Sequence, residues 1–218
     1  MVDPYHPILD DFQFDDFEKV AIATALTKEK PWDWAPGGAE GELIKSIKTK
    51  IRALHMQRHG SRCCYCRKNL AGGGHFVVDR EHVLPKSVAH YHTLAFEVWN
   101  LGVACKRCNM QYKKERVDFL VHPTDMTALR DGANYLLIHP NFDRYKDHIS
   151  ISMLQDDNIT LVSYTKVDGS DKAAFTYEFF NLKELEVSSH DEAQGRVHQD
   201  ELGEFALEAQ AFADAHGQ

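Results

Sequence analysis

The fold is decided by the stretch V-D-R-E-H-V-L-P-K-S (78–87), which continues after a variable segment as W-N-L-G-V-A-C-K-R-C-N-M-Q-Y-K-K (99–114). Its first half places an acidic residue beside a histidine, and its second half places an asparagine directly after a Cys-x-x-Cys pair. Another Cys-x-x-Cys pair lies upstream at 63–66. Oxygen ligands suited to a hard divalent ion and thiolates suited to zinc therefore lie close together in the sequence.

The spacing of the cysteines predicts a structural zinc site. Cys63 and Cys66 form one knuckle and Cys105 and Cys108 a second, and four thiolates complete the tetrahedral shell of Zn²⁺. Because the spacer between the pairs is longer than in a simple zinc ribbon, a hairpin must be folded between the knuckles. The alternative interpretation is a redox dithiol or two pairs of buried cysteines. Cys64 is left over as a spare thiol, although it could replace a neighbouring ligand.

The hairpin between the knuckles carries groups that can catalyse a reaction. His82 can be neutral near pH 7 and accept a proton from water. Glu81 and Asp79 offer carboxylate oxygens to a hard ion such as Mg²⁺ or Mn²⁺, and they would share one face of a strand that ends before Pro85. Asn109 adds a neutral oxygen from the first turn of a helix that we expect to begin at the second knuckle.

These motifs resemble the HNH endonuclease family, which has a metal-binding core of two strands and one helix. The resemblance covers about residues 60 to 116. With the downstream segment I-H-P-N-F-D-R-Y-K-D-H-I (138–149), the chain looks like the HNH proteins of bacterial anti-phage systems of the Septu and retron-associated kind. The matching residues are Glu81-His82 with Pro85 and Ser87, Trp99-Asn100-Leu101, and Cys105-x-x-Cys108-Asn109.

The resemblance implies a role for each matched residue. His82 matches the histidine that acts as general base on the attacking water. Glu81, where the family more often has aspartate, and Asn109 match the ligands of the catalytic metal, and Asp79 is a further candidate ligand. Asn100 matches the middle asparagine, which holds the connecting loop and orients the base.

The resemblance also implies a fold and an activity. We expect an α+β protein with a ββα-metal (HNH) core stabilised by a four-cysteine zinc site, an N-terminal helical region and a C-terminal α/β extension. The implied reaction is hydrolysis of phosphodiester bonds in DNA with one Mg²⁺ or Mn²⁺ ion, and RNA stays open as a second substrate. The absence of an ATPase motif fits a nuclease subunit that acts beside a separate ATPase or sensor.

Charge is distributed unevenly along the chain. The protein carries a net −8, but residues 40–116 contain 15 Lys and Arg against 6 Asp and Glu, a net +9. The basic part is also the part that carries the motif, as phosphate binding requires, although a solvated face would have the same composition. The basic residue usually found three places after the last family asparagine is displaced by one. The residues expected to contact nucleic acid are Lys86, Lys106, Arg107, Lys113 and Lys114.

Composition is that of an ordinary globular protein. The chain has 218 residues, 43% of them hydrophobic, enough for a core in one elaborated domain or two small ones. We expect a helical region over 1–58, the nuclease core with its knuckles over 59–120, and a hairpin with an acidic helical extension over 121–218. Neither a signal-like start nor a membrane-spanning run is evident, so we expect a cytoplasmic protein without a membrane partner.

Periodicity predicts the remaining elements. A helix over 14–28 would place Phe17, Val20, Ala21 and Ala25 on one side. A second helix is expected over 41–59, with a basic face and an apolar stripe of Ile44, Ile47, Ile51 and Leu54. Downstream we expect a hairpin of 149–154 with 159–167 and a strand or helix start over 175–182. The last expected element is an acidic helix over 192–215.

Four further histidines are interpreted as scaffold. His90 and His92 lie in the variable connection, and His139 and His148 bracket an aromatic, charged loop. We expect hydrogen bonds rather than metal ligation or catalysis from them.

Two other functions stay open. A non-catalytic zinc module could bind nucleic acid through the basic segment, and such a module would tolerate His82→Ala. A zinc-dependent base deaminase is disfavoured, because the His-x-Glu and Pro-Cys-x-x-Cys arrangement is missing and four cysteines already close the zinc shell.

Overall fold

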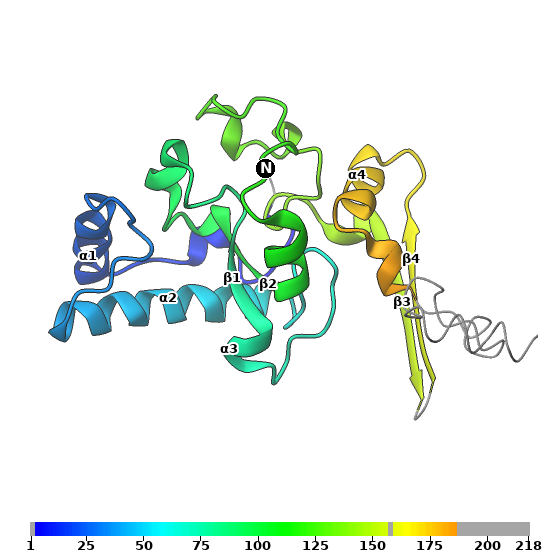
Figure 1. Cartoon of the computed structure of the whole chain (residues 1–218), viewed down its shortest axis with the longest axis horizontal. Helices are drawn as coiled ribbons and strands as arrows, with labels where there is room; N and C mark the ends of the chain where they lie inside the picture. The colour runs from blue at the N-terminus through cyan, green and yellow to red at the C-terminus, as the bar shows by residue number, and fades with distance from the viewer. Residues whose placement is uncertain (1–2, 157–158, 187–218) are drawn as a thin grey trace, which may run out of the picture. The chain divides into compact units, whose positions relative to one another are not determined.

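The computed structural model describes residues 3–156 and 159–186 and confirms an α+β protein with two small two-stranded sheets (Figure 1). Its helices are α1 (Asp16–Leu26), α2 (Gly38–Arg58), α3 (Gly74–Val77), the π-helix η4 (Arg107–Lys113) and α4 (Asp171–Phe179). The strands are β1 (Val78–His82), β2 (Leu101–Cys105), β3 (Ile149–Asp156) and β4 (Ile159–Lys166). Short 3₁₀ turns are η1 (Leu9–Asp11), η2 (Ala89–Leu94), η3 (Val98–Asn100), η5 (Ala128–Arg130), η6 (Gly132–Asn134), η7 (Tyr145–Asp147) and η8 (Leu182–Leu185).

The chain divides into two compact units. Of the residues described, the first unit holds 3–150 and 166–182, and the second holds 151–156, 159–165 and 183–186. All candidate site residues belong to the first unit. None of the helices described is long and apolar enough to cross a bilayer.

Helix α1 begins at a capping box. The Asp15 side chain accepts a hydrogen bond from the Glu18 backbone N–H (2.8 Å), and the Glu18 carboxylate accepts one from the Asp15 backbone N–H (2.9 Å). Glu18 is also paired with Lys50 of α2 at 2.7 Å. The first turn of α1 is therefore tied to α2 by charge.

This ion pair selects the buried face of α1. Glu18, Ala21 and Ala25 are buried, three or four positions apart, whereas Phe17 and Val20 are 80% and 67% exposed. The helix is confirmed, but the prediction that Phe17 and Val20 share a side with the two alanines is wrong. Turning Glu18 toward Lys50 turns those two side chains toward solvent.

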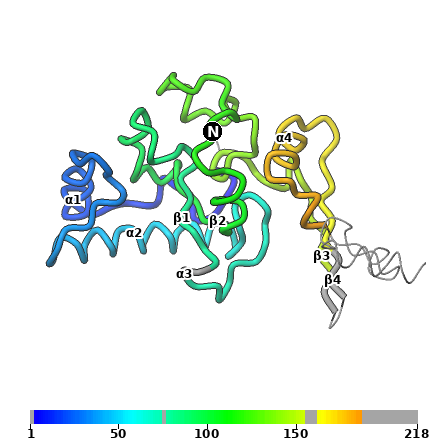
Figure 2. The backbone as a smooth tube through the Cα atoms, in the orientation of Figure 1, coloured from blue at the N-terminus to red at the C-terminus, as the bar shows by residue number. Residues whose placement is uncertain are grey.

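Helix α2 carries the main core of the first unit. Ile44, Ile47, Ile51 and Leu54 are all buried, as the predicted stripe requires. Figure 2 shows α1 above the N-terminal part of this helix, and α2 packs against both α1 and β2. Burial of this stripe places the basic side chains of α2 on its remaining faces.

The first sheet pairs β1 and β2 antiparallel, with Val78 opposite Cys105 and His82 opposite Leu101. The π-helix η4 follows β2 directly. Between the two strands, the chain passes through η2 and η3 and is held by the Asn100 side chain. Its Oδ1 accepts from the Leu84 backbone N–H at 2.7 Å, and its amide donates to the carbonyl oxygens of Leu84 and Leu94 at 3.3 and 3.2 Å.

The downstream motif 138–149 braces this connection, that is, it holds the connection in place through hydrogen bonds. The Asn141 amide donates to the carbonyl oxygens of Trp99 (2.9 Å) and Leu101 (2.7 Å), the residues on either side of Asn100. The backbone N–H of Asn141 donates to His139 Nδ1 at 3.1 Å. The motif therefore contacts the loop that carries Asn100.

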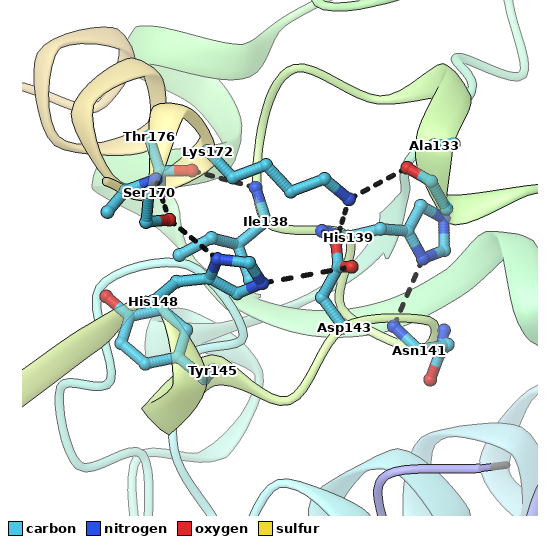
Figure 3. Close-up of polar contacts among 12 residues, drawn as sticks. Ala133, Ile138, His139, Asn141, Asp143, Tyr145, His148, Ser170, Lys172 and Thr176 are labelled. Carbon is cyan, nitrogen blue, oxygen red and sulfur yellow. Dashed lines mark hydrogen bonds and ion pairs between the residues drawn. The ribbon is translucent and has the colours of Figure 1, made fainter. Parts of the chain in front are cut away.

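Hydrogen bonds fix the motif itself to the start of α4 (Figure 3). His148 Nδ1 lies 2.7 Å from Ser170 Oγ, and Lys172 Nζ lies 2.6 Å from the Asp143 carboxylate. Ser170 Oγ also accepts from the Ala173 backbone N–H and so caps α4. These contacts agree with the scaffold role expected for the histidines of this segment.

The predicted hairpin of 149–154 with 159–167 corresponds to β3 and β4. For segment 175–182 the sequence leaves strand and helix open, and most of it belongs to α4 and the turn after it. The acidic helix predicted over 192–215 lies outside the described residues.

Replacing Asn141 tests the brace. Asn141→Ala leaves two buried carbonyl oxygens without their donor, so we expect the free energy of unfolding to fall by about 1–3 kcal/mol, measured by urea denaturation. Lys146→Ala, an exposed change in the same motif, is the control and should leave the midpoint unchanged. Equal midpoints for both variants would show that the Asn141 hydrogen bonds do not stabilise the fold.

Candidate functional site

Four cysteine side chains form a buried cluster that could hold a metal ion such as zinc. The Sγ atoms of Cys63, Cys66, Cys105 and Cys108 lie within 4.8 Å of one another. The Cys66 and Cys105 sulfurs are 3.7 Å apart, close to the ~3.8 Å that a tetrahedral site with zinc–sulfur bonds of about 2.3 Å requires. The Cys105 backbone N–H points at Cys63 Sγ (3.3 Å), as expected for a thiolate ligand.

Cys64 is a separate thiol. It is buried, and burial together with its hydrogen bond to Cys63 raises the pKa of the Cys64 thiol well above its ordinary value. A protonated, enclosed thiol of this kind is inert. The geometry agrees with the interpretation of Cys64 as the spare cysteine.

Two carboxylates of β1 face η4, as strand alternation predicts for positions 79 and 81. Glu81 is only 1% exposed and accepts a hydrogen bond from the Tyr65 hydroxyl at 2.9 Å. The Lys113 ammonium lies 3.5 Å from the Glu81 carboxylate and donates to the His82 carbonyl oxygen at 2.9 Å. Burial raises the pKa of Glu81, and the neighbouring Lys113 charge opposes that rise.

The π-helical turn explains how Lys113 reaches Glu81. The Lys114 backbone N–H donates to the Asn109 carbonyl oxygen, five residues back, at 2.8 Å. A wider turn carries the fourth residue after Asn109 onto the face that looks at β1. Lys113, the displaced basic residue noted in the sequence, is thereby brought beside Glu81 in the interior of the protein.

Asp79 occupies a more open environment. Its side chain is 18% exposed, and its two carboxylate oxygens contact Lys106 Nζ at 3.0 Å and Asn109 Nδ2 at 3.1 Å. The three residues line a shallow hollow of about 410 Å³. The other lining residues are Trp32, Arg52, Val78, Arg80 and Met110.

The donor set of this hollow fits a hard divalent ion. A carboxylate and an amide oxygen in an open, partly wet place are the ligands that Mg²⁺ and Mn²⁺ prefer. Asp79 and Asn109 carry such oxygens, but in this structure the Asp79 carboxylate contacts the Asn109 amide nitrogen and the Lys106 ammonium, which an ion would have to displace. Glu81, the ligand that the resemblance implies, instead contacts Tyr65 and Lys113 in the interior.

His82 lies on the opposite face of β1. Its Nε2 is 3.1 Å from the Ala95 carbonyl oxygen, and because a carbonyl only accepts, Nε2 carries the hydrogen and Nδ1 is the basic nitrogen. Burial lowers the pKa of His82 to about 3, so the imidazole is neutral at pH 7. Asn100 bonds to Leu94, next to Ala95, which agrees with the positioning role implied for Asn100.

The indole of Trp32 covers His82. The two rings meet edge to face with centroids 4.6 Å apart, and His82 is only 6% exposed. Trp32 also lines the hollow beside Asp79, so one indole both contacts His82 and borders the hollow. An ion pair between Asp33 and Lys86 holds the segment in this place.

Two of the five basic residues expected to contact nucleic acid have interior partners. Arg107 donates to the carbonyl oxygens of Phe180 and Asn181, both at 2.8 Å, and Lys113 is buried.

The other three are more accessible. Lys86 and Lys106 take part in ion pairs that are partly open to solvent, and Lys114 is exposed.

Sequence reasoning missed Trp32 and Arg80. A tryptophan in a Pro/Gly-rich loop gave no signal of contact with a histidine 50 positions on. Strand alternation would place Arg80 on the face opposite Asp79, so the pattern gave no signal that both line one hollow.

Metal removal tests the cysteine cluster. We expect the purified protein to hold one zinc ion, and Cys105→Ser to lose it together with much of the fold, because the folded state depends on metal binding. Zinc content by mass spectrometry under native conditions and far-UV circular dichroism measure both effects. Cys64→Ala should keep the ion, and zinc loss in that variant as well would show that the ligand set is wrong.

Replacing Lys113 tests the buried pair. Lys113→Met leaves the Glu81 carboxylate uncompensated, so we expect a loss of about 3–5 kcal/mol in the free energy of unfolding at pH 7. The double variant Glu81→Gln with Lys113→Met removes both charges and should recover much of that loss. A double variant no more stable than the single one would argue against coupling between these residues.

Comparison with protein-family models, with curated proteins and with solved structures gives no match to this chain.

Proposed function

We propose that the protein is a divalent-metal-dependent endonuclease of the HNH kind that hydrolyses phosphodiester bonds in DNA. One observation carries the proposal. Around the β1–β2 hairpin, an Asp79–Asn109 pair suited to a hard cation lies in a cationic hollow, and a neutral histidine with a defined basic nitrogen lies beside it behind Trp32.

His82 would act as the general base. A neutral imidazole whose Nε2–H is held by the Ala95 carbonyl has only Nδ1 available to take a proton from water. Asn100 supports this arrangement through its bonds to Leu84 and Leu94. Because the Trp32 ring covers His82, a substrate phosphate and its attacking water can reach Nδ1 only when the indole withdraws.

Asp79 and Asn109 would hold the divalent ion. When bound, Mg²⁺ or Mn²⁺ supplies positive charge that stabilises the phosphate and the departing 3′ oxygen. Glu81 would have an indirect role. Its ion pair positions Lys113, and Lys113 donates a hydrogen bond to the His82 carbonyl oxygen. Lys106, now paired with Asp79, would be released toward the substrate phosphate.

The wider setting of the proposal rests on the resemblance of the motif and of segment 138–149 to HNH proteins of anti-phage defence. We infer a cytoplasmic nuclease subunit of such a bacterial system, with DNA as substrate and a separate ATPase or sensor as partner. A requirement for that partner would account for a base that is covered when the subunit is alone.

A zinc-dependent nucleic-acid-binding module without catalytic activity is the second candidate. The burial of His82 behind Trp32 favours it, because a residue that never meets substrate needs no access. The two candidates differ in what His82→Ala does. A binding module keeps every activity in that variant.

Plasmid cleavage tests the proposed function. We expect the zinc-loaded protein to nick supercoiled plasmid with Mg²⁺ or Mn²⁺ and not with a chelator, and His82→Ala to lower the rate by at least about 100-fold, the usual contribution of a general base. His90→Ala, an exposed histidine in the same connection, is the matched control and should cut normally.

Two results would count against the proposal. Equal cutting by His82→Ala and wild type would remove His82 as base. Wild type that binds DNA but does not cut it, with either metal and at several protein concentrations, would favour the binding module.

A further inference from the structure

Two arginines of the hollow have no acidic partner among the described residues. Arg52 comes from α2 and Arg80 from β1, and both line the hollow beside Asp79. The Nε of each is buried and makes no hydrogen bond within the described part of the chain. For Arg52 the structure shows one long hydrogen bond, from Nη2 to the Gly74 carbonyl oxygen at 3.5 Å.

Two other arginines, Arg58 and Arg116, are neutralised by a neighbouring aspartate. Arg58 forms two hydrogen bonds of 2.9 Å with the Asp3 carboxylate, and Arg116 is paired with Asp118. The contrast shows that the fold can supply an acid to a guanidinium. At Arg52 and Arg80 it does not, within residues 3–156 and 159–186.

Like charges surround this pair. Burial lowers the pKa of Arg80 and the neighbouring Arg52 lowers it further, while burial and Arg80 lower the pKa of Lys48. The acid that lines the hollow, Asp79, is already paired with Lys106. Partly desolvated cations held close together are unfavourable without a counter-ion, so the arrangement calls for an anion.

We propose that Arg52 and Arg80 form a site for a backbone phosphate of nucleic acid, next to Asp79 and Asn109. A guanidinium presents a planar fork of N–H donors that matches two phosphate oxygens, and the open hollow lets a polymer pass where an enclosed cavity would not. This inference rests on the proposed function for its ligand. It deepens that function by naming the residues that hold the substrate.

DNA binding in the presence of a chelator tests the site, because it does not depend on metal-dependent cleavage. A fluorescently labelled duplex is titrated with the full chain, and anisotropy is followed at several salt concentrations. We expect Arg52→Ala and Arg80→Ala each to weaken binding about tenfold near 0.1 M salt. Each should also reduce the salt slope, the steepness with which the logarithm of the binding constant falls with the logarithm of the salt concentration, by about one, since each removes one phosphate contact.

The matched control is Lys45→Ala. Lys45 is an exposed cation of α2 that pairs with Glu42 and does not line the hollow, so its loss should change neither affinity nor slope. Arg52→Lys and Arg80→Lys guard against misfolding, because they keep the charge. They should retain the wild-type slope while losing part of the affinity that the fork provides.

The outcomes separate this inference from the proposed function. Wild-type affinity and slope in both alanine variants would overturn the site, whatever the plasmid assay shows. Loss of inorganic phosphate binding in the variants, measured calorimetrically, with duplex binding unchanged would also overturn it and assign a free-phosphate site. Binding that falls as expected in a protein that does not cut would keep the site and favour the binding module over the nuclease.

Discussion

The four-sulfur cluster is the constraint on which the rest of the site depends. Cys63 and Cys66 come from a loop, Cys105 ends β2, and Cys108 lies in the first turn of η4. Joining these sulfurs fixes where η4 leaves the sheet, and therefore which of its side chains look at β1. Asn109 follows the last cysteine directly, so its amide is placed beside Asp79 by the cluster rather than by packing of its own. The sheet of this unit has only two short strands, so a metal bound by the four sulfurs would supply stability that a larger hydrophobic core would otherwise provide.

A second constraint follows from burying charge. Glu81 and Lys113 lie 3.5 Å apart in the interior, and the lysine reaches that place only because η4 makes a π-helical turn. Removing ions from water is costly unless hydrogen bonds satisfy them; here the Tyr65 hydroxyl and the His82 carbonyl do so. The pair links the helix to the backbone of the candidate base. It also keeps Glu81 in the interior and leaves Asp79 as the carboxylate that faces the hollow.

Much of this could be predicted from sequence where a local rule applied. Cysteine spacing indicated the cluster, the stripe of α2 identified its buried face, and strand alternation put positions 79 and 81 on one face. Predictions failed or were absent where a distant contact decided the result. Phe17 is exposed because Glu18 pairs with Lys50 of another helix. The π-turn of η4 has no local sequence signal, and no periodicity places Trp32 on His82 or Arg52 beside Arg80.

Trp32 links the two halves of the candidate site. The Trp32 indole contacts His82 and also lines the cationic hollow. The segment that carries it is held by an Asp33–Lys86 pair whose side chains are 53% and 36% exposed. An exposed pair of this kind contributes no more than about 1 kcal/mol, and a phosphate approaching Lys86 would compete for the same ammonium. Contacts from arginine to phosphate position a nucleic acid without reading its sequence. The proposed nuclease would have little selectivity at such contacts, so the indole that covers His82 would keep it inactive until substrate or partner displaces it.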